Sequence, residues 1–385
     1  MEWRDASRKF VRLRFEIIVA LGSQLELMLE ANNNQPFEQP MSIHAVESPV
    51  YDSVSVIIPC YNEERFIGKA LEQLADQFES DRYELVIVDG LSEDRSRAVV
   101  EEFCERRPDV NVLLVDNPAR NIPTALNLGI AAASGNIIAR MDAHAVPSDG
   151  YIRRCVEVLQ TGAAGAVGMP CLVRPGADTV IAQGIAAAVS HPFGIGDAKY
   201  RLGSSGPQQE AVDTVAFACF RKSLWKELGG YNESLHTNED YDFNYRVRRS
   251  GRQVILDRGG HCDYFARSTL KAVGKQYVRY GGWKAEMIRL HPRSTKLRHL
   301  VAPLFVASIL ALGIAGIFWK PAWWLLIVEL VTYLGCALLA GWQAARRAGA
   351  GLQMALVMPL IFATIHLSWG SSFLVRLVLS EKSHG

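Results

Sequence analysis

The stretch VSVIIPCYNEERFIGKAL, residues 54–71, joins an uninterrupted apolar run to a stretch with helical spacing. The same pattern recurs: strand-like runs are predicted at 54–58, 84–89, 110–116 and 136–142, and helix-like stretches at 64–78, 92–106 and 121–134. Apolar strands that alternate with helices of this length are typical of a parallel sheet covered on both faces. The sequence therefore predicts an α/β fold over 54–268.

Candidate ligand-binding residues, most of them polar, follow the predicted strands at their carboxyl ends, where ligands collect in an open α/β sheet. They are Pro59, Tyr61 and Glu63 after the first strand, Asp89 after the second, Arg120 after the third and Asp142 after the fourth. Carboxylates along one edge repel each other unless a cation or a hydrogen-bonding ligand lies between them. A nucleotide offers hydroxyl and N–H groups to Glu63 and Asp89, while its phosphates need a cation or Arg120.

Composition excludes some partners and sites. The 41 Lys and Arg residues nearly balance the 40 Asp and Glu residues, so nucleic acid is not an expected partner. The seven cysteines contain no C-x-x-C pair, which indicates neither a zinc site nor a disulfide framework and favours a reducing compartment. The 385 residues are enough for one large or two moderate domains.

Three apolar segments, 300–319, 321–342 and 351–375, follow one another near the C-terminus. The second carries Glu329 as its one acid and the third carries His366 as its one ionisable residue. Because a membrane span needs roughly 20 apolar residues, we expect a transmembrane region of about three helices at 299–379. Gly370 and the two serines after it would let the third span bend or become re-entrant.

The basic residues that flank these spans predict their orientation. Arg289, Arg293, Lys296 and Arg298 precede the first span, Arg346 and Arg347 follow the second, and the first link has only Lys320. The positive-inside rule then places 1–298 and 343–350 in the cytoplasm and the C-terminus outside, as in a multi-pass protein of the inner membrane. By helix rise, Glu329 and His366 lie at similar depth, and we expect them to pair as a clasp or to contact a lipid-linked acceptor.

The flanking segments are treated separately. Residues 1–50 are expected to be an N-terminal extension, either an amphipathic helix on a membrane or on the domain, or poorly specified residues upstream of Met41. Residues 269–298 are expected to be an amphipathic interfacial segment. A Gly-, Ser- and Pro-rich loop at 200–217 is expected to cover the site and to order when the donor binds.

Four stretches resemble the family-2 inverting glycosyltransferases, whose α/β domain binds a nucleotide sugar. They are VSVIIPCYNEERFIGKAL (54–71), VIVDGLSEDRS (86–96), ALNLGIAAASGNIIARMDAH (125–144) and NEDYDFNYRVRRSG (238–251). Within that family, ARMDAH and the three-span tail look most like the membrane-associated glucosyltransferases of succinoglycan-type exopolysaccharide synthesis. The resemblance implies a Rossmann-like mixed, mainly parallel sheet of the glycosyltransferase A type, with the catalytic domain at 51–268.

The resemblance also implies a divalent metal, Mn²⁺ or Mg²⁺. Family members usually end the fourth strand with Asp-x-Asp, which holds the metal against the diphosphate, whereas this chain has Asp142-Ala143-His144. Alternation along an extended chain points Asp142 and His144 to the same side. Both can bind Mn²⁺, although His144 can also act as a hydrogen-bond donor to phosphate.

The catalytic base is expected from a second segment. By the resemblance, the second acid of ED, Asp240, is the base, and Glu239 orients the acceptor or the backbone. The segment predicts a helix with Asn238 as its cap, where the dipole favours a carboxylate; both acids satisfying the helix start alone is the alternative. Asp242 and Arg246 are expected to form an i,i+4 surface pair.

Family members with membrane tails often carry Gln-x-x-Arg-Trp before a span, with the Arg on the diphosphate. The matching residues here are Gln276, Arg279 and Tyr280, so a Tyr replaces the Trp. An interfacial helix whose aromatic and basic residues lie at the lipid headgroups is the alternative, and both interpretations can hold together.

Together these features predict an inverting transferase that moves a sugar, with glucose as the expected sugar, from a UDP-sugar to a polyprenyl-diphosphate-linked saccharide in exopolysaccharide synthesis. Its expected partners are the donor, the lipid-linked acceptor, the membrane and other polysaccharide-assembly proteins. A polyprenyl-phosphate sugar synthase and a processive polysaccharide synthase are the rival enzymes. A catalytically dead membrane scaffold is the rival outside the enzymes.

Overall fold

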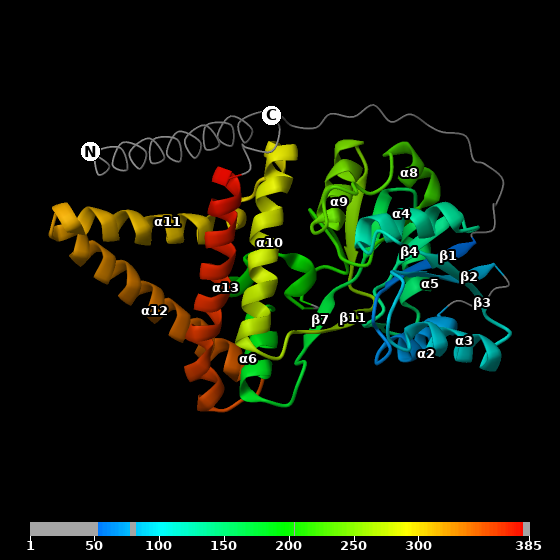
Figure 1. Ribbon diagram of the computed structural model, residues 1–385, viewed down its shortest axis with the longest axis horizontal. Coiled ribbons are helices and arrows are strands. Elements are labelled where there is room, and N and C mark those ends of the chain that lie inside the picture. Colours follow the sequence, from blue (N-terminus) through cyan, green and yellow to red (C-terminus); the bar gives the residue numbers. More distant parts are fainter. Residues whose placement is uncertain (1–52, 78–81, 204, 380–385) are drawn as a thin grey trace.

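The structure is a computed structural model that describes residues 53–77, 82–203 and 205–379; the extension at 1–50 lies outside the described residues. Its core is an eight-stranded sheet of order β3-β2-β1-β4-β9-β6-β10-β8 (Figure 1). These strands are β1 (Val54–Cys60), β2 (Tyr83–Asp89), β3 (Asn111–Asp116), β4 (Ile137–Arg140), β6 (Ala164–Gly168), β8 (Gln209–Ala211), β9 (Cys219–Arg221) and β10 (Gln253–Asp257).

The four predicted strands are β1 to β4, and they form the parallel half of the sheet. β1 pairs in parallel with β2 and with β4, and β2 pairs in parallel with β3. β9 runs antiparallel between β4 and β6, which makes the sheet mixed, as expected. Because parallel strands end at the same edge, Cys60, Asp89 and Asp116 stand in register there.

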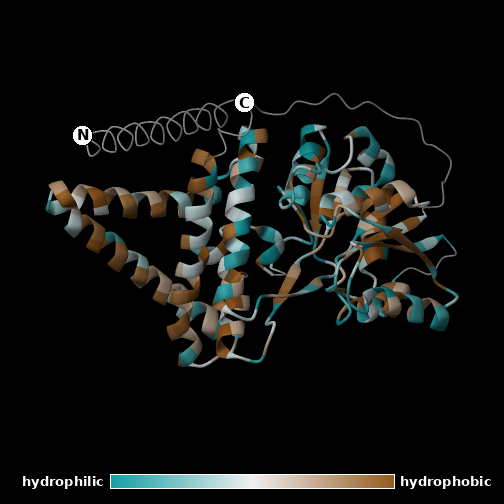
Figure 2. Ribbon diagram, viewed as in Figure 1, coloured by the Kyte–Doolittle hydropathy of each residue, from teal (hydrophilic) through white to brown (hydrophobic). Residues whose placement is uncertain are grey.

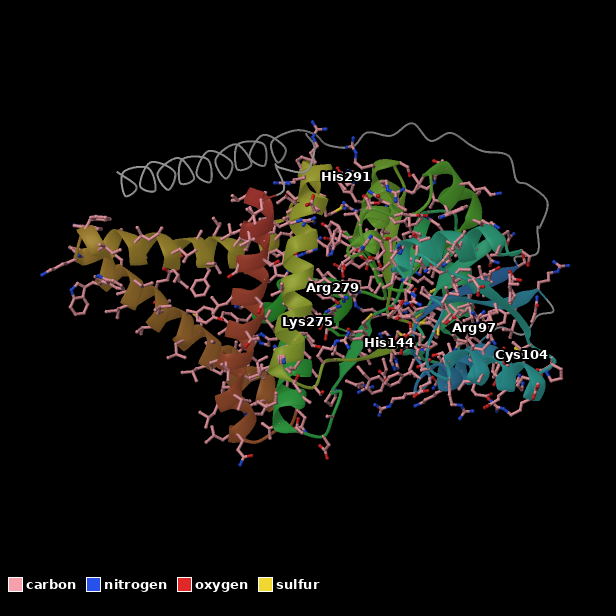
Figure 3. All side chains as sticks on the ribbon, viewed as in Figure 1. Arg97, Cys104, His144, Lys275, Arg279 and His291 are labelled. Atoms are coloured by element: carbon pink, nitrogen blue, oxygen red, sulfur yellow. The ribbon has the colours of Figure 1, made fainter. Side chains whose placement is uncertain are left out.

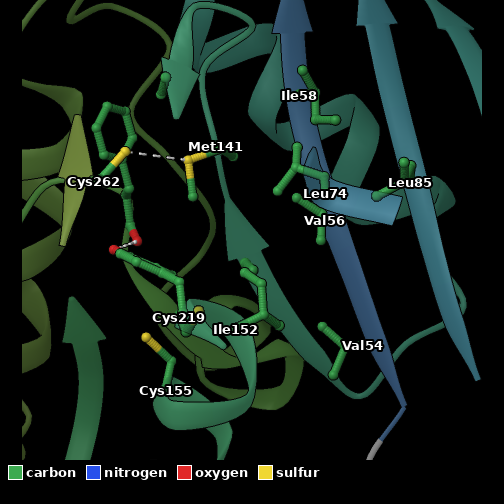
Figure 4. Close-up of a cluster of buried hydrophobic side chains, with 14 of the residues drawn as sticks. Val54, Val56, Ile58, Leu74, Leu85, Met141, Ile152, Cys155, Cys219 and Cys262 are labelled. Atoms are coloured by element: carbon green, nitrogen blue, oxygen red, sulfur yellow. Dashed lines mark hydrogen bonds between the residues drawn. The ribbon is translucent and has the colours of Figure 1, made fainter. Parts of the chain in front are cut away.

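Helices cover both faces of this sheet. Alternation along β1 sends Val54, Val56 and Ile58 to one face, where they pack with Leu74 (Figure 4), and Ile57 to the other. The first face carries α2 (Ile67–Ala75), α3 (Ser96–Arg106) and α5 (Tyr151–Gln160), and the second carries α4 (Ile122–Ala132), α8 (Lys222–Glu227) and α9 (Glu239–Arg249). The predicted cover on both faces is confirmed.

A smaller sheet of order β5-β11-β7 connects this domain to the C-terminal helices. It consists of β5 (Ala145–Pro147), β11 (Cys262–Phe265) and β7 (Cys171–Arg174), and it is followed in space by α6 (Val180–Ala188), α7 (Pro192–Ile195) and the short turn η1 (Lys199–Arg201). The segment predicted as a loop at 200–217 contains β8, which pairs antiparallel with β10 at the edge of the main sheet. Part of that loop is therefore sheet.

The C-terminal part consists of α10 (Leu270–Leu290), the turn η2 (Pro292–Ser294), α11 (Leu297–Phe318), α12 (Pro321–Arg347) and α13 (Leu352–Leu379). The last three are long and apolar enough to cross a membrane. α10 runs beside α13, while α11 and α12 diverge from α13 and meet at their far ends (Figure 1). Hydrophobic residues cover α11 and α12, whereas α10 carries hydrophilic residues along its length (Figure 2).

Glycines allow the helices around α13 to approach closely. A Cβ added at Gly281 of α10 would lie 2.2 Å from the Trp369 carbonyl oxygen of α13, and one added at Gly370 would lie 2.5 Å from the Ala302 carbonyl oxygen of α11. Small residues at such crossings are typical of membrane helix packing. α13 continues without a break through Gly370, and that glycine permits the close contact with α11.

Replacing Gly281 by Ala is expected to destabilise the junction of α10 and α13 by about 1–3 kcal/mol, because the backbone of α13 must move to admit the methyl group. Thermal unfolding of the full chain in detergent would measure the loss. Gly313→Ala on α11 is the matched control, since a Cβ there has no neighbour within 4 Å. Equal midpoints for the two variants would contradict this packing argument.

The expected pairing of Glu329 with His366 is wrong. Glu329 and His366 do not pair: Glu329 accepts a hydrogen bond from the Ser308 hydroxyl, while His366 contacts the Tyr333 hydroxyl at 3.0 Å and the Phe193 carbonyl at 2.9 Å. Helix rise fixed their depth but not the direction in which each side chain points.

Asn62 does not cap α2, the helix that follows it. α2 begins at Ile67, and its N-cap residue is Phe66, which makes no side-chain cap hydrogen bond. The Asn62 side chain instead accepts a hydrogen bond from the Glu93 backbone N–H at 2.8 Å, and so ties the loop after β1 to the loop after β2.

Candidate active site

One cavity of about 710 Å³ lies between the sheet domain and the C-terminal helices. Its sheet side is lined by Asp142, His144 and Asp240, and its helix side by Phe305, Tyr333 and Trp369. Residues separated by more than 200 positions therefore share one chamber with an acidic wall and an apolar wall. The His144 side chain and Arg279 of α10 are labelled in Figure 3.

The acidic wall is organised by a buried arginine that the sequence interpretation missed. Arg140, the last residue of β4, is 7% exposed. Its guanidinium lies 2.9 Å from the Glu239 carboxylate and 3.3 Å from the Asp142 carboxylate. The sequence signal for this residue was an arginine within an apolar predicted strand. Because a charge is buried only when it is paired, that arginine predicts acidic partners.

Glu239 forms an ion pair with this arginine. Burial raises the pKa of Glu239, and the nearby Asp240 adds to that effect, while Arg140 opposes it. The ion pair with Arg140 at 2.9 Å makes Glu239 part of the supporting structure beside the cavity. The position suits the expected role of an orienting residue.

Asp240 lies in the first turn of α9 and faces the cavity. Its carboxylate accepts a hydrogen bond from the Tyr241 backbone N–H at 2.7 Å, and among the described residues it forms no ion pair. The expected Asn cap is only partly right: Asn238 occupies the N-cap position at φ 71° but its side chain makes no cap hydrogen bond. Asp240 is thus held in place by the helix start with a carboxylate oxygen left for a ligand.

The expected surface pair on α9 is buried instead. Asp242 is 1% exposed, and it bonds both to Arg246 at 2.6 Å and to the His291 imidazole at 2.8 Å. Helical spacing predicted the contact with Arg246 but not the packing of the segment after α10 over it. Asp242 therefore joins α9 to the C-terminal part.

All three residues of the Gln-x-x-Arg segment line the cavity from α10. The Gln276 amide donates to the Tyr280 hydroxyl at 2.8 Å and to the Tyr264 hydroxyl at 3.2 Å. The Arg279 guanidinium lies 5.7 Å from the centroid of the Tyr280 ring. These residues share the cavity with Asp142 and Asp240, so a cation and two acids line one chamber.

The other expected donor-binding residues lie beside the cavity rather than on its wall. The Arg120 guanidinium lies over the ring of Tyr61 at 5.4 Å, next to Pro59 at the end of β1. The Asp89 carboxylate, 1% exposed, accepts hydrogen bonds from Ser92 and pairs with Arg97 at 3.3 Å. Its oxygens are already engaged within the loop.

Backbone strain marks the same edge. Asn62, Leu91, Arg120 and Asn238 adopt positive φ angles between 52° and 71°, one in each loop that follows β1, β2 and β3 and one before α9. Residues other than glycine rarely adopt this conformation, and such strain clusters at functional sites. Asparagine is enriched in this conformation, so Asn62 and Asn238 carried a weak sequence signal, whereas Leu91 and Arg120 carried none.

A metal fits the Asp142 and His144 pair only with help from a ligand. Among the described residues no group of three or more acids, histidines and cysteines could hold a metal ion. His144 Nδ1 contacts the Glu63 carboxylate at 3.1 Å, and this hydrogen bond raises the pKa of His144 although burial opposes it. A carboxylate behind an imidazole is the usual support of a metal-binding histidine. The donor set suits a metal completed by phosphate oxygens and water.

The known proteins that this chain resembles are glycosyltransferases or proteins of polysaccharide synthesis. A family model described as glycosyl transferase family 2 matches residues 55–229. The succinoglycan biosynthesis protein ExoA of Rhizobium meliloti is 29% identical over 322 residues, which are 83% of this chain and 93% of that protein. The chain is a glycosyltransferase with a family 2 domain. The resemblance seen in its motifs is confirmed.

Two further relatives of this glycosyltransferase are informative. A dolichyl N-acetyl-alpha-D-glucosaminyl phosphate 3-beta-D-2,3-diacetamido-2,3-dideoxy-beta-D-glucuronosyltransferase of Methanococcus voltae is 26% identical over 241 residues, 61% of this chain and 74% of that protein. The mannosyltransferase PcManGT from Pyrobaculum calidifontis, solved in complex with GDP-Man and Mn²⁺, superposes with a TM-score of 0.57 at 21% identity, covering 96% of this chain and 99% of that one. That likeness shows the fold.

Proposed function

We propose that this glycosyltransferase inverts the anomeric centre as it transfers a sugar, glucose first among the candidates, from a UDP-sugar to a polyprenyl-diphosphate-linked saccharide. One observation carries the proposal: the cavity that contains Asp142 and Asp240 continues to the apolar side chains of helices long enough to span a membrane. The nucleotide-sugar donor needs the wall with the acids, and the lipid chain of the acceptor needs the apolar wall. The name of the Methanococcus voltae relative, which includes a dolichyl-linked sugar phosphate, supports a lipid-linked acceptor, and the name of the ExoA protein supports a role in exopolysaccharide synthesis.

The reaction follows from the residues on the two walls. Asp240 accepts the proton of the acceptor hydroxyl. The oxygen of that hydroxyl bonds to the anomeric carbon from the face opposite the diphosphate. The bond between the anomeric carbon and the diphosphate oxygen breaks, and the electron pair leaves with UDP. Arg279 and Gln276 lie where they can hold that departing charge.

Asp142 and His144 would hold the metal, Mn²⁺ or Mg²⁺, which when bound neutralises charge on the diphosphate. Glu63 orients His144 through the 3.1 Å contact at Nδ1. The basic residues before α11 and after α12 favour a catalytic domain on the cytoplasmic side of the inner membrane. Confinement of the enzyme and a lipid-bound acceptor to the same membrane would raise the effective concentration of that acceptor.

Product analysis tests the proposal. The full chain in detergent would receive UDP-[¹⁴C]glucose, Mn²⁺ and a polyprenyl-diphosphate-linked saccharide, and we expect one labelled hexose added to the lipid-linked saccharide. A labelled monosaccharide phospholipid would support the polyprenyl-phosphate synthase instead, and a long polymer would support the processive synthase. No transfer from any nucleotide sugar would favour the scaffold.

The metal role predicts a separate result. Asp142→Asn is expected to raise the Mn²⁺ concentration for half-maximal transfer by at least about tenfold, since even a supporting residue of a metal site is worth about 10- to 100-fold in metal affinity. Initial rates measured against Mn²⁺ concentration would show the shift. Asp109→Asn, at an exposed acid paired with Arg107, is the control. Identical Mn²⁺ curves for wild type and Asp142→Asn would remove Asp142 from the metal site.

A further inference from the structure

A buried lysine on the cavity wall forms no ion pair among the described residues. Lys284 of α10 is 6% exposed and lines the cavity. Its ammonium lies 3.5 Å from the centroid of the Tyr241 ring, and among the described residues it makes no hydrogen bond or ion pair. Burial lowers the pKa of Lys284 to about 7. A buried ammonium is costly without a counter-charge, so the position suits an anion that arrives with a ligand.

The neighbours of Lys284 reinforce this. Arg298 and His299, from the first turn of α11, line the same cavity. Arg298 already pairs with Asp197 at 2.5 Å and with Asp213, so its charge is compensated. Lys284 is therefore a buried cation with no ion pair among the described residues, although the charges of Asp240 and Asp213 favour its protonated form.

The cavity wall becomes apolar immediately beyond this point. Val301, Ala302 and Phe305 follow Arg298 within two turns of α11, and all three line the cavity. Trp369 of α13 lines it as well. The order along α11 is thus a cationic turn followed by an apolar surface on a helix long enough to enter a membrane. This order matches a phosphate attached to a hydrocarbon chain.

We propose that Lys284 binds the phosphate group of the lipid acceptor nearest its polyprenyl chain, with the chain lying along Val301 and Phe305 of α11. The inference rests on the proposed function and names the site that it requires. A donor diphosphate has the same chemistry, but its expected groups are Asp142, His144 and Arg279, and it carries no hydrocarbon chain. Tyr241, which contacts Lys284, follows Asp240 directly, so the site adjoins the base.

Lys284→Met tests the proposal, because it removes the charge and keeps the length of the side chain. We expect the KM for the polyprenyl-diphosphate-linked saccharide to rise at least tenfold, the KM for UDP-glucose to stay within twofold, and Lys284→Arg to restore most of the loss. Lys275→Met, at an exposed lysine on the same helix, is the matched control. The thermal midpoint of Lys284→Met should not fall, since a buried unpaired charge is lost.

Direct binding separates this inference from the proposed function. Polyprenyl diphosphate without saccharide or donor should bind wild type at least tenfold more tightly than Lys284→Met, whereas polyprenol, which lacks phosphate, should bind both equally. A rise in the KM for UDP-glucose alone would assign Lys284 to the donor and overturn the proposal. Equal binding of polyprenyl diphosphate by both proteins would also overturn it, whether or not transfer is observed.

Discussion

Asp240→Asn is expected to lower the rate of sugar transfer by about 10²- to 10⁴-fold, the usual contribution of a positioned general base. The amide cannot accept the proton of the acceptor hydroxyl, so the attacking oxygen keeps its proton as the new bond forms. Asparagine has the shape of aspartate, and its side-chain oxygen can still accept the Tyr241 N–H bond. The loss should therefore be in kcat, with the thermal midpoint unchanged.

The measurement is the initial rate at saturating donor and acceptor. Asp240→Glu should recover part of the rate, because it restores a carboxylate in a slightly displaced position. Affinity for UDP should stay within a few-fold, since Asp240 acts on the acceptor. A rate for Asp240→Asn above a tenth of the wild-type rate would assign the base to another residue.

Arg140→Met is expected to destabilise the fold by about 3–5 kcal/mol, the cost of breaking a buried ion pair by removing one partner. Asp142 and Glu239 would then face each other across the end of β4 without their shared cation. Thermal unfolding of the full chain in detergent should show a clear drop in the midpoint. Arg140→Lys, which retains the charge, should lose less.

The pH dependence gives this prediction a second test. Without Arg140, burial and the nearby Asp240 carboxylate both act on Glu239 and hold its folded-state pKa above the unfolded value. The folded protein then binds more protons than the unfolded protein, so stability falls as pH rises between those two pKa values. Adding Glu239→Gln to Arg140→Met should remove most of this slope. If Arg140→Met alone were as stable as wild type at pH 8, the role given to Arg140 would be contradicted.

The sequence predicted the parallel half of the sheet because its strands are continuous apolar runs and its helices are local. β3 and β4 fall within the predicted runs, β1 and β2 extend one or two residues beyond theirs, and α2, α3 and α4 fall within the predicted helices. Local periodicity carries this information since each element depends on residues close in the chain. The three apolar helices were predicted for the same reason.

The contacts that complete the site are long-range, and no local pattern encodes them. Arg140 meets Glu239 across 99 residues, and Phe193 meets His366 across 173 residues. Glu329 was paired with the wrong partner because depth along a helix does not define its rotation. Asp242 was assigned to the surface because its i,i+4 contact with Arg246 is the same on an exposed or a buried face.

The candidate site was found from the sequence where residue type and motif sufficed. Asp142, His144, Asp240 and Gln276 do line one cavity. Lys284 and Arg140 were missed because a single basic residue in a helix or strand has no distinctive spacing. Only the fold shows that both residues are buried, and a buried charge requires a partner or a ligand.

The most direct test of the central claim is a calorimetric titration of the full chain with UDP, in the presence and absence of Mn²⁺. The account holds that the acids at the carboxyl edge of the sheet receive a nucleoside diphosphate together with a divalent cation. It predicts saturable heat with Mn²⁺ and much weaker binding without it. No heat of UDP binding in the presence of Mn²⁺ would contradict it.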